Sequence, residues 1–373
     1  MDSQREGDFF DLQREFDGYL EAKEPGRRAR ADAWATAIGL QAVDGLSPSA
    51  YLYEIARRHI DGDITADKAR DLVDDYYETK AGRELPEELR EADKVAARII
   101  KVINDEGFDL SPSYFAALHG LVFENVLKGA GRFRDVNIRK HEWVLKDDSV
   151  TYGDWKTIAS SLDYAFDRER EFSYARQTNL QRIRHFSRFI ATVWQIHPFR
   201  EGNTRTTAVF AVKYLKSLGY PVANNAFKEN SWYFRNALVR VCYENPLKGI
   251  AKTGEPLERF FRNLLLGEDN ELKSRYLRIG LSKTQESTLK AGRAETEKRS
   301  EKGGQKKAVR KSGQKTAERL WQLLKDHPHL SQAGLVAALG IARSTVQKHI
   351  DNLKGAGRLR RIGPDKGGHW EAV

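Results

Sequence analysis

The chain has very little cysteine and no long apolar run. Cys242 is the single cysteine among 373 residues, so a disulfide bond within the chain is excluded. No apolar stretch reaches the roughly 18 residues that a membrane-spanning helix needs. The first residues, MDSQREGDFFDL, carry acidic groups and lack the basic-then-apolar order of a secretory signal. These absences predict a soluble cytoplasmic protein with no membrane partner.

Positive charge is in excess and is concentrated in one segment. Lys and Arg number 63 against 53 Asp and Glu, a formal net charge of +10. Between Lys290 and Lys315 aliphatic side chains almost vanish, while Lys, Arg, Gly and Ser dominate. Such a composition cannot bury enough apolar surface to fold, so we expect a solvated basic linker over 284–315. An arm that binds nucleic acid is the alternative interpretation, since excess positive charge permits a polyanionic partner.

Helical periodicity dominates the remaining sequence up to residue 283. Apolar residues recur at helical spacing in segments 31–43, 48–59, 65–77, 86–127, 155–166, 178–194 and 209–215. One segment differs: IRKHEWVLKDDSVTYG, near Ile138 to Tyr152, alternates and contains a polar turn, which predicts a β-hairpin. The stripes after Thr178 and after Val209 predict two core helices, so residues 197–206 connect two buried helices.

The last part of the chain has a pattern of its own. Helical segments at 316–325, 331–339 and 343–354 precede two short apolar stretches, 359–362 and 369–373, that flank a glycine-rich turn. Three helices followed by a two-stranded wing resemble a winged helix-turn-helix. We therefore predict a mainly α fold: a helical module at 1–85, a helical core with a hairpin flap at 86–283, a linker at 284–315 and a winged helix at 316–373.

The connection HPFREGNTRT, residues 197–206, collects polar groups at a helix N-terminus. Unsatisfied N–H groups of the helix that follows, with Gly202, Asn203 and Arg205, are suited to bind phosphate. Glu201 would repel that phosphate unless a divalent cation such as Mg²⁺ bridged the two. His197 would accept the proton of an attacking hydroxyl. Each residue alone is more often structural, but their order and spacing together favour a catalytic site.

This connection resembles the active-site loop of Fic-domain proteins, whose consensus is HPFx(D/E)GNGRxxR. The resemblance extends to GRFRDVNIRKHEWVL, which is similar to the segment leading into the family's flap, and to NSWYFRNALVR, which is similar to its nucleotide-side helix. It implies a helical Fic-like core and a protein adenylyltransferase that moves AMP from ATP, with Mg²⁺, onto a Ser, Thr or Tyr hydroxyl of a target protein.

The resemblance also implies a role for individual residues. His197 is the expected general base and Glu201 the Mg²⁺ ligand. The expected nucleotide-binding residues are Gly202, Asn203, Thr204, Arg205, Tyr233 and Asn236. The flap, through Arg139, Lys140 and His141, would hold the target segment by strand addition.

Two positions depart from the consensus: Thr204 replaces its second glycine and Ala208 its last arginine. Loss of that arginine removes a contact to the terminal phosphate. Doc-like relatives, which resemble kinases, also lack the glycine, so a protein kinase using the same loop is an alternative. A DNA-binding regulator whose degenerate Fic core only senses nucleotide is a second alternative.

A regulatory segment is expected before the core. AIGLQAVDGLSP resembles the inhibitory helices of antitoxins of the VbhA type, with Asp44 in place of their glutamate. Because Ala208 is neutral, the family's usual inhibitory ion pair cannot form, and inhibition by Asp44 is a hypothesis. In the winged helix, DNA contacts are expected from Arg343, Ser344, Thr345, Gln347, Lys348 and Lys366; a protein-docking winged helix is the rival interpretation.

Overall fold

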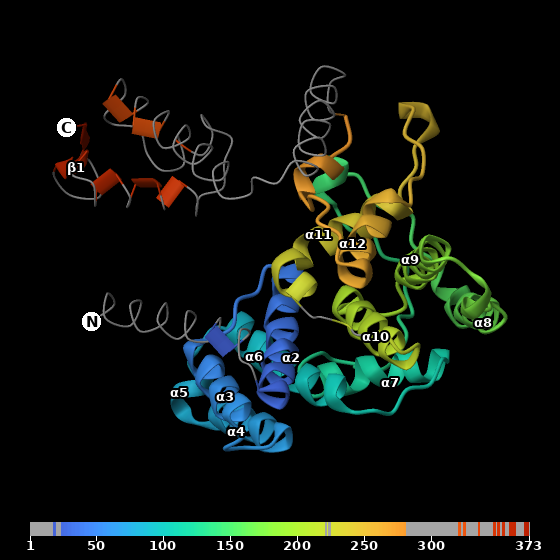
Figure 1. Ribbon diagram of the computed structural model, residues 1–373, viewed down its shortest axis with the longest axis horizontal. Helices are drawn as coiled ribbons and strands as arrows, with labels where there is room; N and C mark the ends of the chain where they lie inside the picture. Colours follow the sequence, from blue (N-terminus) through green and yellow to red (C-terminus); the bar gives the residue numbers. More distant parts are fainter. Residues whose placement is uncertain are drawn as a thin grey trace. The chain divides into compact units, whose positions relative to one another are not determined.

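The chain divides into two compact units, Met1–Leu281 and Ser282–Val373, in this computed structural model (Figure 1). The structure describes residues 18–19, 24–220, 222, 225–280, 320–321, 324–325, 335, 346–347, 349–350, 353–354, 358–362 and 369–372. Over these residues the fold is mainly helical, as predicted. None of the described helices has the length and apolar character needed to cross a bilayer.

The first helices of the larger unit confirm the expected N-terminal pattern. They are α2 (Pro25–Gly39), η1 (Leu40–Asp44), α3 (Ala50–Asp61), α4 (Ala66–Glu78) and α5 (Lys80–Arg83). Ser49 and Thr65 cap α3 and α4 with side-chain oxygens, and Gly45 ends η1 in the left-handed conformation. Helix α2 packs against α6 and α11, so this segment lies directly on the helical core.

The helical region expected over 86–127 is broken in two. Helix α6 (Glu87–Asn104) ends before α7 (Pro112–Phe123), and residues 105–111 between them are not helical. The interruption has local causes: the Asp105 side chain accepts the Gly107 N–H at 2.8 Å, and Ser111 caps a new helix that has proline in its first turn. The prediction of one continuous helical region is therefore wrong.

The core of the larger unit is built around α10 (Asn203–Ser217). Every residue of α10 from Asn203 to Leu215 is buried. Around it lie α7 and α9 (Asn179–Ile196), and α9 in turn contacts α8 (Ile158–Arg170), α11 (Asn225–Cys242) and α12 (Glu255–Leu266) (Figure 1). A complete capping box formed by Thr178 and Gln181 fixes the start of α9. Two long apolar helices thus hold the connection between them at the centre of the unit.

The β-hairpin predicted at 138–152 is not formed in the structure. This segment contains no strand in the described structure; it holds only the short turn η2 (Trp143–Leu145). The Lys140 N–H donates to the Ser149 hydroxyl at 3.3 Å rather than to a carbonyl, and Val144 and Leu145 turn inward and are buried. Side-chain bonding and burial of the turn replace a strand ladder, although the Glu142 N–H still reaches the Asp148 carbonyl at 3.0 Å.

The smaller unit contains the expected strand pair. Strands β1 (Leu359–Ile362) and β2 (His369–Ala372) are antiparallel, with Leu359 opposite Ala372. The described apolar residues around them form one buried cluster: Leu320, Leu324, Leu335, Val346, Ile350, Leu353, Leu359 and Trp370. The winged-helix assignment stays a prediction, because most of residues 316–373 lie outside the described residues.

Candidate active site

The connection between α9 and α10 has two left-handed residues that set its shape. His197 ends α9 with φ 52°, and Gly202 precedes α10 with φ 74°. A Cβ at Gly202 would lie 2.5 Å from the ring of Phe123, so glycine is required for space as well as conformation. No side chain caps the first N–H groups of α10, which leaves this helix end suited to an anion.

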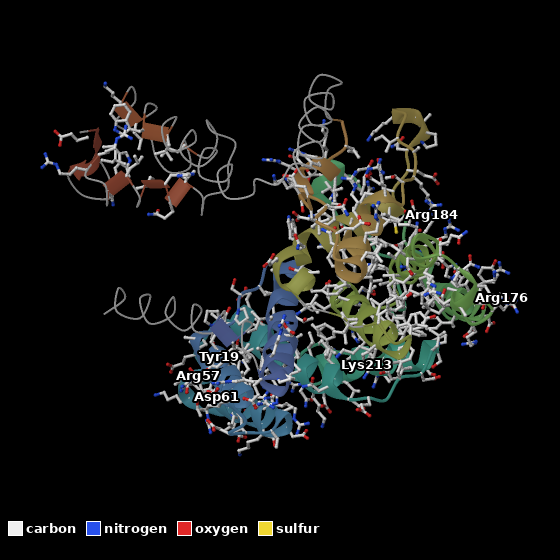
Figure 2. The ribbon with its side chains drawn as sticks, viewed as in Figure 1. Tyr19, Arg57, Asp61, Arg176, Arg184 and Lys213 are labelled. Atoms are coloured by element: carbon white, nitrogen blue, oxygen red, sulfur yellow. The ribbon has the colours of Figure 1, made fainter. Side chains whose placement is uncertain are left out.

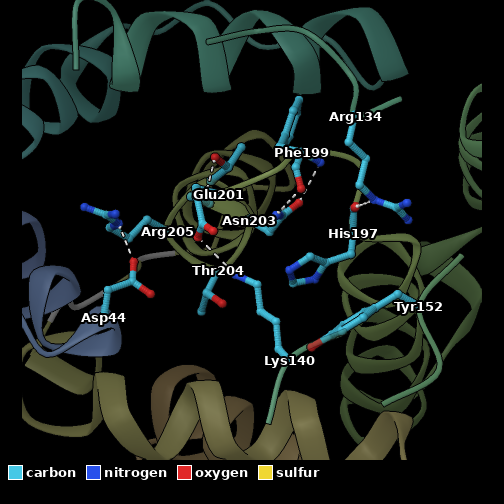
Figure 3. Close-up of polar contacts among 12 residues, drawn as sticks. Asp44, Arg134, Lys140, Tyr152, His197, Phe199, Glu201, Asn203, Thr204 and Arg205 are labelled. Atoms are coloured by element: carbon cyan, nitrogen blue, oxygen red, sulfur yellow. Dashed lines mark hydrogen bonds and ion pairs between the residues drawn. The ribbon is translucent and has the colours of Figure 1, made fainter. Parts of the chain in front are cut away.

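Arg134 holds the first half of this connection by its backbone. Its Nε donates to the His197 carbonyl at 2.8 Å (Figure 3). Its Nη2 donates to the carbonyls of Ile196, at 3.2 Å, and Gly153. The Arg134 N–H donates to the Pro198 carbonyl at 2.8 Å. Arg134 is buried, so these bonds satisfy a cation that would otherwise be costly to desolvate. No role was predicted for Arg134 from the sequence.

The His197 ring is presented as a neutral base. Its Nδ1 lies 3.2 Å from the Trp194 carbonyl, which can only accept, so Nδ1 carries the proton and Nε2 has the free lone pair. Nε2 is buried without a hydrogen-bond partner. Burial, reinforced by the charge of Lys140, holds the pKa of His197 well below its usual value. The ring is therefore ready to accept a proton at neutral pH.

Tyr152 packs beside this histidine and links it to the flap. The two rings have centroids 4.2 Å apart (Figure 3), and the Tyr152 hydroxyl donates to Glu142 at 3.2 Å. Glu142 is fully buried and forms a 2.7 Å ion pair with Arg235 of α11. Burial and the adjacent carboxylate raise the pKa of Tyr152, so its hydroxyl stays protonated. This chain of contacts fixes one wall of the His197 side chain.

His119 of α7 supports the loop from the opposite side. Its Nδ1 accepts the Gly131 N–H at 2.8 Å, so its Nε2 carries the proton and donates to the Glu201 carbonyl at 3.0 Å. The imidazole is stacked on Phe199, with centroids 3.8 Å apart. Burial lowers the pKa of His119 to about 4. His119 is a second supporting residue for which no role was predicted from the sequence.

The two polar residues that open α10 make their contacts inside the protein. Asn203 accepts the Phe199 N–H at 3.0 Å and donates to the Phe199 carbonyl at 2.8 Å, so its side chain closes the loop. The Thr204 hydroxyl accepts the Trp194 indole N–H at 3.0 Å, and its own hydrogen is left to donate. The threonine that departs from the consensus thus has a partner on α9.

The expected metal ligand, Glu201, is exposed and faces Lys140. The Lys140 Nζ lies 3.0 Å from the Glu201 carboxylate, whose side chain is 64% exposed (Figure 3). The described residues contain no cluster of three or more potential metal ligands. One carboxylate fits Mg²⁺ only if phosphate oxygens and waters complete the shell, which is how this ion is commonly bound. Glu201 is suited to that role once Lys140 moves away.

Arg205 has its charge matched by residues from outside the loop. Its Nε is 2.8 Å from the Asp44 carboxylate of η1, and its Nη2 is 2.6 Å from Glu91 of α6 (Figure 3). Nη1 donates to the Gln41 side chain at 3.1 Å, and the guanidinium lies over the Phe123 ring. Asp44 therefore pairs with the first arginine of the motif, whereas the sequence suggested only that the usual pair with position 208 is lost.

A cavity of about 530 Å³ lies against these groups. It is lined by Asp44, Glu201, Arg205, Trp232 and Arg235, with neighbouring residues of 43–46, 91 and 127. A volume of this size is typical of small-molecule sites. The arginines, the acids and the exposed indole of Trp232 thus face one space beside the start of α10.

The other predicted site residues lie elsewhere. Tyr233 and Asn236 are buried: the Tyr233 hydroxyl donates to the Pro256 carbonyl, and the Asn236 amide donates to the Trp232 carbonyl and to Ser274. On α11, the residues that line the cavity are instead Trp232 and Arg235. In the flap, His141 Nδ1 contacts the Asp147 carbonyl at 2.7 Å, and Arg139 lies 3.8 Å from Asp148.

Of the DNA-contact candidates, the structure describes Gln347. Gln347 is described and lies in a helical segment, with its side chain half-buried. Arg343, Ser344, Thr345, Lys348 and Lys366 lie outside the described residues.

Comparison with known proteins finds similarity over the segment that holds this site. Residues 109–215, from just before α7 to near the end of α10, match the model of the Fic/DOC family. The probable protein adenylyltransferase y4lH of Sinorhizobium fredii is 27% identical over 135 residues. That similarity covers 35% of this chain and 65% of the relative, less than two thirds of its length.

Two solved structures are also similar to the chain. A Fic family protein from Desulfovibrio desulfuricans is 14% identical, with a TM-score of 0.40 and coverage of 100% of this chain and 95% of that one. The N-terminal Fic domain of a VirB-translocated Bep effector from Bartonella quintana is 18% identical, with a TM-score of 0.37, over 50% of this chain and 85% of that one.

Proposed function

We propose that the protein is a protein adenylyltransferase that moves AMP from ATP onto a Ser, Thr or Tyr hydroxyl of a target protein. The observation that carries this proposal is the His197 Nε2 atom, which is neutral, buried and without a partner, next to the uncapped start of α10. Transfer of a phosphoryl group to a hydroxyl requires a base for the hydroxyl proton and hydrogen-bond donors for the phosphate oxygens. The Fic/DOC match of residues 109–215 supports the same chemistry.

The proposed reaction assigns each group a role. His197 Nε2 takes the proton of the target hydroxyl as its oxygen forms a bond to the α-phosphorus. The bond from that phosphorus to the bridging oxygen breaks, and pyrophosphate leaves with the electron pair. The first N–H groups of α10 and the Thr204 hydroxyl would donate to the phosphate oxygens, and Arg205 would bind them once free of Asp44. Mg²⁺, held by Glu201 and phosphate oxygens, would neutralise part of the phosphate charge when bound.

Isotope position tests which phosphate moves. We expect protein labelled by ATP carrying the label at the α-phosphate, no label from the γ position, and loss of labelling in His197→Ala. Arg200→Ala, which removes a surface ion pair with Asp135 from the same loop, is the matched control and should label normally. Absence of labelling from either position, with wild type correctly folded and the target supplied in lysate, would contradict both enzyme readings.

A protein kinase is the second candidate function. Ala208 is fully buried and provides no cation where the consensus has its last arginine, so the terminal phosphate has one contact fewer. A nucleotide bound in another orientation would then present its γ-phosphate to His197. Label from the γ position alone, dependent on His197, would establish this alternative. Labelling absent from both positions, with nucleotide still bound, would instead favour a DNA-binding regulator that only senses nucleotide.

We further propose that η1 inhibits the site through Asp44. Its carboxylate is 2.8 Å from the Arg205 guanidinium, and Glu91 contacts the same group, so an entering phosphate must compete with two acids. Asp44→Asn should raise both nucleotide affinity and labelling, by about tenfold for one charge-assisted contact. Asp63→Asn, an exposed carboxylate in the same helical module, is the control. Unchanged affinity in Asp44→Asn would show that Asp44 is only structural.

We propose DNA as the partner of the C-terminal unit. The supporting observations are the antiparallel pair β1 and β2 and the apolar cluster beneath it, with basic residues clustered in the sequence around them. Phosphate-driven binding to duplex DNA should weaken steeply as salt rises. Binding that does not depend on salt would favour a protein-docking role.

A further inference from the structure

A second cavity, of about 460 Å³, is lined by residues that include neither Arg205 nor His197. One stripe of α9 forms its floor, through Arg184, Ser187 and Arg188. Its walls come from the end of α11, from the loop before α12, which contains Lys252, and from the start of α12. Arg184 is labelled in Figure 2. None of these residues belongs to the candidate active site.

The lining carries more positive than negative charge. Three cationic side chains line the cavity, those of Arg184, Arg188 and Lys252, against one carboxylate, that of Glu258. The existing ion pairs are long: Arg184 Nε lies 3.5 Å from Glu258, and Lys252 Nζ lies 3.7 Å from Glu244. Partly exposed pairs at such distances contribute little, so these cations are available to a stronger anion.

The start of α12 adds a helix end that no side chain caps. Gly254 is its N-cap residue and lines the cavity, and α12 extends for 12 residues. Pro256 has no N–H, but the N–H groups of Glu255 and Leu257 and the positive end of the helix dipole favour an anion here. The carboxylate of Glu258, which would be 2.9 Å from a Cβ at Gly254, is the group that an anion would displace.

Ser187 provides an independent indication of a ligand. The residue is 2% exposed and lines the cavity, yet its hydroxyl has no hydrogen-bond partner. A buried hydroxyl without a partner costs free energy that a bound acceptor would recover. Such a hydroxyl at the base of a basic cavity is what a bound phosphate oxygen would satisfy.

We infer that this cavity binds a phosphorylated small molecule by its phosphate group. Arg184, Arg188 and Lys252 would supply the charge, while the Ser187 hydroxyl and the first N–H groups of α12 donate to the oxygens. The cavity is much larger than a phosphate ion, and the apolar side chains of Ala191 and Val241 line its remaining part. The organic part of a phosphate monoester would lie against them. This inference does not depend on the proposed catalytic function.

Calorimetric titration of the full chain with ribose 5-phosphate, ribose and inorganic phosphate tests the inference. Ribose 5-phosphate should bind, ribose should not, and inorganic phosphate should bind more weakly. Arg188→Gln and Lys252→Gln should each weaken binding by about tenfold, as expected for one charge-assisted contact. Arg168→Gln, which removes an exposed ion pair with Glu171 on α8 outside both cavities, is the matched control and should bind as wild type.

Ser187→Ala separates binding from folding. Removing an unpartnered hydroxyl should leave the melting temperature of the free protein unchanged or raise it, while ribose 5-phosphate binds more weakly. No binding by wild type, or binding lost in Arg205→Gln and kept in Arg188→Gln, would overturn the assignment. Equal affinity for inorganic phosphate and ribose 5-phosphate would show that the ligand is a free anion and that the organic part of the proposal is wrong.

Discussion

The two ends of the His197 to Thr206 segment are held in different ways. At the first end, the carbonyls of Ile196 and His197 accept from the buried Arg134, and in the middle of the segment the Glu201 backbone carbonyl accepts from the buried His119. At the second end, the charged side chains are held by ion pairs from other segments, Glu201 by Lys140 and Arg205 by Asp44 and Glu91. The position of the base is thus built into the core, whereas the groups that would meet phosphate have partners that an anion or a cation can replace.

Arg134→Ala should have the largest effect, because it breaks the fixed end. The change removes a buried guanidinium and leaves the carbonyls of Ile196, His197 and Gly153 without their donor. Several lost bonds of this kind should lower the free energy of unfolding by about 3–5 kcal/mol. Urea unfolding followed by circular dichroism would measure it. Arg200→Ala, at an exposed ion pair, should change it by less than about 1 kcal/mol; equal losses would contradict the comparison.

Gly202→Ala tests the close approach at the turn between the two ends. The new Cβ would meet the Phe123 ring at 2.5 Å in a residue with φ 74°, so strain and overlap add. We expect a loss of about 2–4 kcal/mol. Gly45→Ala is a closely matched control, since Gly45 has φ 75° but no atom within 4 Å of its Cβ position. It should cost only the conformational term, about 1 kcal/mol. A control as costly as Gly202→Ala would remove the steric argument.

Neighbouring threonines on α10 give a smaller test. Thr204→Val leaves the buried Trp194 indole N–H without its acceptor and should cost about 1–2 kcal/mol. Thr207→Val removes a buried hydroxyl that has no partner, so it should be neutral or stabilising. Thermal unfolding of the two variants measures the difference. If they behave alike, the Trp194 contact does not stabilise the start of α10.

The sequence predicted the helices and the loop well because both leave local patterns. The apolar stripe from Leu180 to Trp194 predicted the helix that is α9, and the order of groups in HPFREGNTRT indicated the candidate site. The prediction of a hairpin at 138–152 was wrong because the alternation of apolar and polar residues reflects a turn that buries Val144 and Leu145, not the hydrogen-bond ladder of two strands. Alternation in so short a segment does not distinguish the two.

Partners from distant segments were beyond reach of the sequence. Arg134, His119 and Glu91 contact the loop across 63 to 114 residues of chain, and no local spacing marks them. Asp44 was identified from its segment's resemblance, but its partner was not, because the pairing with Arg205 depends on how η1 packs against α10. Arg134 stands among other charged residues in GRFRDVNIRK, so nothing in the sequence marks it as the buried one.

The smallest expected effect concerns pH and the fixed end. His119 has a pKa of about 4 when folded against 6.5 when unfolded, so the unfolded chain binds more protons between these values. Stability should therefore fall as pH is lowered through this window, by about 1 kcal/mol between pH 6.5 and about pH 5.5 for this residue. The pKa of His59, on α3, is also lowered to about 4 by burial, so His59 contributes a similar pH dependence of stability away from the loop.

Urea titrations at both pH values should show His119→Gln and His59→Gln each reducing the slope of stability against pH by the same amount. Only His119→Gln should also slow labelling, because it alone removes the donor to the Glu201 carbonyl; a slope unchanged in His119→Gln would mean that His119 is not held neutral by the fold.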